Sequence, residues 1–109
     1  MKLKPKHDRR RYDARARIAK ALAHPSRLMI LDALDGREVC VCDLTDLVGA
    51  VQSTVSKHLA ILKQAGLVAD RKDGVMVFYK LNACCLQGFW DCLEQVLAAN
   101  LKAQQAVLR

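Results

Sequence analysis

The fold is decided by residues 52–66, which read Gln52-Ser53-Thr54-Val55-Ser56-Lys57-His58-Leu59-Ala60-Ile61-Leu62-Lys63-Gln64-Ala65-Gly66. Val55, Leu59 and Leu62 recur at the i, i+4, i+7 spacing of one helix face, which predicts an amphipathic helix. Ser53 suits the N-cap of this helix, and Gly66 suits its C-terminal cap. The segment is therefore expected to bury one side and to present a polar side to a partner or to solvent.

Two helices and a short third one are predicted before this segment. The first covers about residues 9–23 and ends before Pro25, because the residue that precedes a proline leaves helical space. Pro25 itself suits the first turn of a second helix, which an Asp-Gly pair ends. Residues 38–42 alternate and indicate an extended segment. Asp43 is a suitable N-cap for a third, short helix that stops at Gly49.

A β-hairpin and a long helix are predicted after residue 66. Alternating apolar residues around Lys72-Asp73-Gly74 indicate two strands with an Asp-Gly turn. Residues 83 to about 106 form a helix with a broad apolar face, which a chain of 109 residues has little core to cover. We therefore expect a dimer interface on the terminal helices, made by Ile18, Leu22, Phe89, Trp90, Cys92, Leu93 and Leu97.

This order of elements predicts a mainly α (α+β) fold, the winged helix-turn-helix, in the order α-α-α-α-β-β-α, with a homodimer through the first and last helices. The chain divides into a basic N-terminal arm at residues 1–11 and one winged helix-turn-helix domain with dimerising terminal helices at residues 12–106. In such folds the polar-faced helix enters the major groove of DNA, and the hairpin tip touches the backbone.

The charge of the chain is concentrated at its start. Residues 1–20 hold nine Lys and Arg against Asp8 and Asp13, which accounts for the whole net charge of +7. The other 89 residues hold nine basic and nine acidic side chains. A polyanion such as double-stranded DNA is the natural partner of such an arm, and the alternative is a solvated, partly disordered tail.

DNA contacts are expected from the polar helix face and from the hairpin. Hydroxyl groups and ammonium groups suit phosphates, and short polar side chains suit base edges. A polar helix face can instead be merely solvated, and His58 can equally be a surface or capping histidine. The inference rests on the three features occurring together, and the predicted contacts are Gln52, Ser53, Thr54, Ser56, Lys57, His58, Lys63, Arg71 and Lys72.

Five cysteines occur in a chain with no apolar run long enough to span a membrane and no hydrophobic signal region. A cytoplasmic protein with no membrane partner is therefore expected, with reduced thiols that do metal or redox work. Enzyme activity is not expected, because no paired carboxylates, phosphate-binding loop or nucleophile-base arrangement is visible. A protein-interaction module that does not bind DNA is disfavoured by the basic arm.

Three segments closely resemble the ArsR/SmtB family of bacterial metalloregulatory repressors, of the arsenical-resistance ArsR type. They are residues 21–31 (ALAHPSRLMIL), 38–44 (EVCVCDL) and 52–68 (QSTVSKHLAILKQAGLV), within a match that spans about residues 14–82. The resemblance implies a homodimeric repressor on a palindromic operator that releases DNA when an inducer binds. It also implies that the Cys-x-Cys box, Cys40-Val41-Cys42, binds arsenite or antimonite, or else cadmium, lead or zinc.

The chemistry of Cys40 and Cys42 agrees with that implication. Thiolates are the ligands that thiophilic ions require, and the unpaired amides of a helix N-terminus favour a thiolate. In an extended segment, residues two apart point to the same side, so both sulfurs could ligate one ion. The alternative is that one or both thiols are small buried apolar side chains.

The third thiol of an arsenite site is missing from the box, because Thr45 stands where the arsenite-type members usually have a cysteine. Our hypothesis is that Cys84 or Cys85 completes a site for As(III) or Sb(III) with Cys40 and Cys42. Cys92 is interpreted as packing at the core or interface. Cd(II), Pb(II) and Zn(II) remain alternative inducers, and so does sensing of thiol redox state or reactive sulfur by the same fold.

Overall fold

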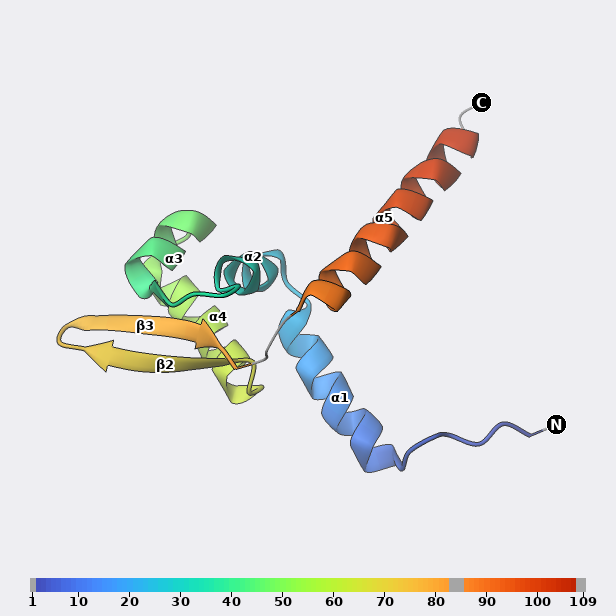
Figure 1. Ribbon diagram of the computed structural model, residues 1–109, viewed down its shortest axis with the longest axis horizontal. Helices are drawn as coiled ribbons and strands as arrows, with labels where there is room; N and C mark the ends of the chain where they lie inside the picture. Colours follow the sequence, from blue (N-terminus) through green and yellow to red (C-terminus); the bar gives the residue numbers. More distant parts are fainter. Residues whose placement is uncertain (1, 83–85, 108–109) are drawn as a thin grey trace.

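The computed structural model of the chain describes residues 2–82 and 86–107. Within these ranges lie five helices and three strands, in the order α1 (Arg9–Leu22), α2 (Pro25–Ala33), β1 (Val39–Cys40), α3 (Val41–Val48), α4 (Gln52–Gln64), β2 (Val68–Asp73), β3 (Met76–Leu81) and α5 (Gln87–Val107) (Figure 1). The winged helix-turn-helix predicted from the sequence is confirmed. It gains one strand, β1, which the predicted order α-α-α-α-β-β-α does not contain.

The start of α3 differs from the prediction. Cys40 is the N-cap, so Asp43 is the third residue of the helix and not its cap. The reason is the sheet: Cys40 pairs with Phe78 of β3, which holds its backbone extended, and the chain turns into α3 immediately afterwards. Cys42 therefore lies in the first helical turn and not in an extended segment with Cys40.

The start of α4 also differs, because Val51 is the N-cap and Ser53 is the second residue of the helix. The carbonyl oxygen of Val51 accepts hydrogen bonds from the amides of Thr54 and Val55 at 3.0 and 3.2 Å. These bonds close the first turn with no side-chain cap. The hydroxyl of Ser53 is therefore not used as a helix cap.

The three strands form an antiparallel sheet in the order β1-β3-β2. Asp73 is still part of β2 and pairs with Met76, so the hairpin turn consists of Gly74 and Val75 rather than the predicted Asp-Gly pair. Gly74 has φ +62°, whereas Val75 does not have a positive φ. A type II′ turn needs this left-handed backbone at its first central position, which glycine adopts without a Cβ clash.

One hydrophobic core joins α2, α3, α4 and the start of β2. The predicted stripe of α4 is confirmed, since Val55, Leu59 and Leu62 are all buried. They pack against buried residues from neighbouring elements, namely Ala21, Ile30, Leu31, Leu34, Leu44 and Val68. Burial of side chains of this size stabilises each helix by roughly 1.5–3 kcal/mol per residue. The core therefore fixes both helices of the helix-turn-helix.

The terminal helices extend from this body (Figure 1), and α5 contains no fully buried residue. Trp90 and Leu86 pack against the edge of the core, while Leu97 and Leu101 are more than half exposed. The predicted last helix starts at Gln87 here, and residues 83–85 lie outside the described ranges. No helix in the described ranges is long and apolar enough to cross a membrane.

Candidate nucleic-acid interface and thiol site

The exposed face of α4 carries most of the predicted DNA contacts. Val55, Leu59 and Leu62 of this helix are buried. Five of the predicted contacts are exposed, namely Gln52, Ser53, Thr54, Ser56 and Lys57. The buried stripe fixes the rotation of α4, so these five side chains are presented together. This arrangement can offer hydroxyl, amide and ammonium groups to phosphates and base edges.

His58 lies differently from its neighbours, because its ring is half-buried. The ring centroid lies 4.4 Å from that of His24, and its Nδ1 atom lies 3.2 Å from Nη1 of Arg27. Burial lowers the pKa of His58, and the nearby charges of His24 and Arg27 lower it further. The structure thus brings His58 to α2 rather than leaving it on the open face.

Lys63 is held by a carboxylate of the hairpin. Its Nζ lies 2.9 Å from Oδ1 of Asp70 in β2, and this hydrogen bond raises the pKa of Lys63 and lowers that of Asp70. About half of the Lys63 side chain stays exposed, so the contact is screened by solvent. Lys63, one of the predicted DNA contacts, therefore links α4 to β2 through this ion pair.

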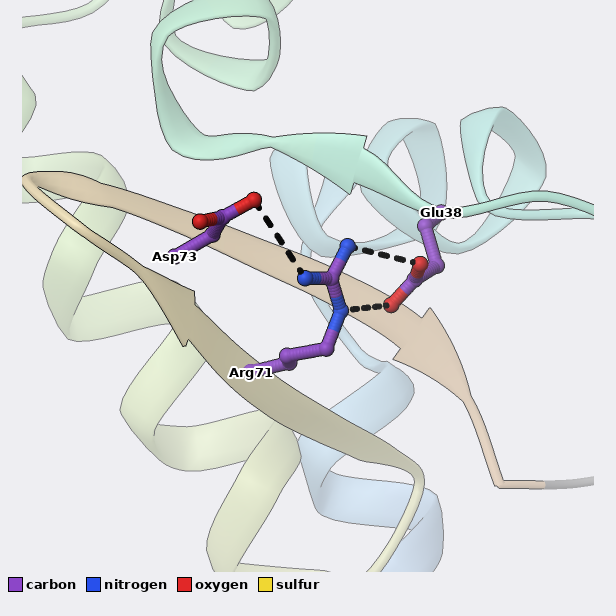
Figure 2. Close-up of polar contacts among 3 residues, drawn as sticks. All are labelled: Glu38, Arg71 and Asp73. Atoms are coloured by element: carbon purple, nitrogen blue, oxygen red, sulfur yellow. Dashed lines mark hydrogen bonds and ion pairs between the residues drawn. The ribbon is translucent and has the colours of Figure 1, made fainter.

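Arg71 contacts three side chains, and Figure 2 shows two of them, Glu38 and Asp73. Its Nε and Nη2 atoms donate to the two carboxylate oxygens of Glu38 at 3.1 Å each, and its Nη1 lies 3.8 Å from Asp73. Its guanidinium also stacks 4.8 Å from the ring centroid of Phe78. Arg71 thereby holds the pKa of the Glu38 carboxyl below its usual value. Lys72 is exposed and pairs with Val77 in the sheet.

The two cysteines of the box differ in burial. Cys40 is buried, and Cys42 is exposed in the first turn of α3. Both line one groove of about 410 Å³ between α4 and the hairpin, together with Gln52, Ser56, Lys72 and Tyr79 among others. The structure therefore places both thiols beside the predicted DNA-contacting surface.

The predicted third thiol, Cys84 or Cys85, lies outside the described residues. Cys92 is exposed on α5. In the described ranges, no three His, Cys, Asp or Glu side chains gather closely enough to hold a metal ion. Thr45, at the position where a third cysteine was sought, donates its Oγ1 hydrogen to the carbonyl of Val41 at 2.8 Å.

The predicted dimer residues lie on the two terminal helices. Leu22, Phe89, Trp90 and Leu93 are half-buried in the single chain. Ile18, Cys92 and Leu97 are exposed. These side chains leave apolar surface that a second chain can cover.

A helix-turn-helix with a buried rear face, a polar front face and a β-hairpin beside it defines a winged helix-turn-helix DNA-binding regulator of transcription. The family described as "Bacterial regulatory protein, arsR family" matches residues 24–70. The chain is 36% identical over 98 residues to the arsenical resistance operon repressor of Staphylococcus aureus, a match that covers 90% of this chain and 91% of that protein. The protein belongs to the arsR family.

Solved structures agree with this assignment. The crystal structure of Rv0081 from Mycobacterium tuberculosis has a TM-score of 0.74 and 34% identity, and the match covers 89% of this chain and 98% of that one. A homodimeric winged helix-turn-helix DNA-binding domain from Mycobacterium bovis, solved by solution NMR, has a TM-score of 0.73 and 29% identity over 94% and 95% of the two chains. These relatives are regulators and not enzymes, as expected from the sequence.

The Glu38–Arg71 pair leads to a prediction. Glu38→Gln removes the nearer of the two carboxylates that contact the Arg71 guanidinium, and we expect DNA binding about 2- to 5-fold tighter at low salt, the scale of an exposed ion pair. Fluorescence anisotropy of a labelled duplex measures it. Asp32→Asn is the matched control, because it removes one exposed carboxylate from α2. Weaker binding by Glu38→Gln alone would mean that the pair orients the hairpin and does not compete with DNA.

Proposed function

We propose that this arsR-family DNA-binding repressor leaves its operator when a thiophilic ion, arsenite or antimonite, binds Cys40 and Cys42. The observation that carries the proposal is that both cysteines line the groove that also contains Gln52 and Ser56 of α4. Thiolate pairs suit such ions. The name of the Staphylococcus aureus relative supports arsenic as the inducer.

The route from ion to DNA follows from the packing of α3. In this proposal, an ion bound by both sulfurs links Cys40, the buried N-cap residue of α3, to Cys42 in the first turn, and so pulls on the start of that helix. Leu44 anchors that helix in the core that also holds α4. A shift of α3 is therefore passed to the DNA-contacting helix through side chains that cannot compress.

The third ligand in this proposal is Cys84 or Cys85, from the segment between β3 and α5. Arsenite bound by three thiolates would then join the start of α3 to the segment that leads into α5. The proposal also includes a homodimer through α1 and α5, supported by the exposed apolar residues of α5 and by the homodimeric Mycobacterium bovis relative. DNA contacts are assigned to the exposed residues of α4 and to Lys72.

The test is a titration of the reduced protein with arsenite, antimonite, cadmium and zinc. The probe is a duplex that the wild-type protein selects from a random-sequence pool, called the selected duplex below. We expect arsenite and antimonite to release the selected duplex while three free thiols per chain disappear. Release with no loss of thiols would contradict the proposal. Release by an oxidant in the presence of chelator, reversed by a dithiol, would replace it with redox sensing.

A further inference from the structure

Three side chains, His24, Arg27 and His58, meet where α2 packs against α4. Arg27 of α2 places Nη1 3.2 Å from Nδ1 of His58, in the middle of α4. His24, the N-cap of α2, accepts a hydrogen bond at its own Nδ1 from the amide of Ser26 at 3.0 Å, and its ring packs on His58. The cluster thus joins α2 to α4 through Arg27 and His58, which are 31 residues apart in the sequence.

The donors in this cluster set the hydrogen-bond roles of two ring nitrogens. A guanidinium and a backbone amide can only donate, so Nδ1 of His58 and Nδ1 of His24 both accept. The His58 imidazole that accepts from Arg27 is neutral, with its hydrogen on Nε2. Protonation of His58 would replace the acceptor with a donor that faces Arg27, and the hydrogen bond would break.

Arg27 also holds the end of α1. Its Nε donates to the carbonyl of Ala21 at 2.6 Å, and its Nη2 donates to that of Lys20 at 3.4 Å. The carbonyl of Ala21 lies in the last turn of α1, where carbonyls lack intrahelical partners, so the Nε bond satisfies it. The carbonyl of Lys20 also accepts from the amide of Ala23 at 3.2 Å, so Arg27 adds a second donor there. The planar guanidinium therefore bonds to α1 and α4 at once, which the single ammonium of a lysine cannot reproduce.

We propose that Arg27 is a positioning residue for DNA recognition, and that it orients α4 by holding His58 and the end of α1 together. We call the hydrogen bonds from Arg27 to His58 and to the end of α1 the Arg27 latch. In this latch His58 is the hydrogen-bond acceptor, and it does not contact bases. The proposal rests on DNA binding by the exposed face of α4, but it is independent of the inducer and of the cysteines. Loss of the latch should change how well α4 fits its specific sequence more than it changes attraction to any DNA.

The latch has a defined pH dependence. In the described part of the chain, the titratable and charged groups that act on His58 are His24 and Arg27, and both disfavour its charged form. The pKa of His58 is lowered from the usual 6.5. The latch is therefore intact above pH 6.5 and is lost as the pH falls through the lowered pKa. A histidine that contacted phosphate would behave in the opposite way, because its added positive charge would tighten binding in acid.

The experiment measures affinity from pH 8 to pH 5 with chelator and reductant present, so its outcome does not depend on the inducer proposal. The probes are the selected duplex and a scrambled duplex of equal length. Arg27→Lys keeps the positive charge but loses the planar guanidinium that donates to α1 and α4 at once. We expect at least about 10-fold weaker binding of the selected duplex, the scale of lost charge-assisted hydrogen bonds. Binding of the scrambled duplex should change less than about 2-fold by the same reasoning.

Arg37→Lys is the matched control, because the Nε of Arg37 also donates to a helix-end carbonyl, that of Ala33 at 2.8 Å. It should bind both duplexes as wild type does. His58→Asn puts an amide oxygen near the place of Nδ1 and cannot be protonated, so it should keep specific binding as pH falls while wild type loses it. This comparison stands even if Arg27→Lys does not fold.

Three results would overturn the proposal. The first is that Arg27→Lys binds both duplexes as wild type does. The second is that it weakens both duplexes equally, which would indicate a phosphate contact. The third is acid-strengthened binding by wild type that His58→Asn abolishes, since it would make His58 a DNA contact.

Discussion

Replacing both Cys40 and Cys42 with serine is expected to give a protein that binds the selected duplex with wild-type affinity and no longer releases it in arsenite. Serine is close to cysteine in size, so the buried N-cap position should tolerate it, but its hydroxyl is not a ligand for thiophilic ions. The loss should be complete at arsenite concentrations that release wild type fully. Anisotropy of the labelled duplex during arsenite addition measures it.

Cys92→Ser is the control for loss of a thiol that is not proposed as a ligand: Cys92 is exposed in the single chain, lies among the predicted dimer residues of α5 and is remote in sequence from the box. It should release DNA as wild type does. Single replacements of Cys84 and Cys85 then identify the third ligand: the replacement that weakens the response names it. A full arsenite response from the Cys40→Ser/Cys42→Ser protein would refute the proposed site.

Neutralising the basic arm is expected to weaken binding of all DNA sequences by a similar factor. Arg9–Arg11 lie inside α1, and Asp8 caps this helix by accepting from the amide of Arg10 at 2.7 Å, so deletion of residues 1–11 would also damage the helix. The better variant replaces Lys2, Lys4, Lys6 and Arg11 with glutamine. The log-log salt slope should fall by about 0.9 for each phosphate that the variant no longer neutralises.

Affinity should fall by about 10-fold or more at moderate salt, because the variant neutralises several fewer phosphates and residues 21–109 carry no net charge. The selected and scrambled duplexes should be affected alike, since the arm is assigned no base contacts. Lys102→Gln on α5 is the control for a change of charge alone. An unchanged salt slope would make the arm a solvated tail.

The helix-turn-helix was predictable from sequence because its signals are local. The spacing of Val55, Leu59 and Leu62 depends only on helical periodicity, and the glycines that end α3 and α4 have the positive φ that favours glycine. The caps at Asp43 and Ser53 were wrong, because sheet pairing at Cys40 and the backbone of Val51 set the helix starts. At Cys40, pairing with β3 overrode the side-chain preference for the cap position.

The candidate site was less predictable, because its polar contacts join distant parts of the chain. Glu38 and Arg71 are 33 residues apart, and Arg27 and His58 are 31 residues apart. No periodicity or motif links either pair. The predicted hairpin tip and the polar face of the predicted helix identified Arg71 and His58 as candidate DNA contacts, but only the structure shows that their hydrogen bonds are used within the protein.

Strand β1 has a consequence for engineering. Cys40 is at once the N-cap of α3 and the partner of Phe78 in β3, and Glu38, two residues earlier, holds Arg71 of β2. The first cysteine of the Cys-x-Cys box is therefore also part of β1, the third strand of the sheet. A biosensor built by grafting another receptor loop at residues 38–42 would remove that strand, so retuning this protein for a new analyte requires point changes that keep its backbone pairing.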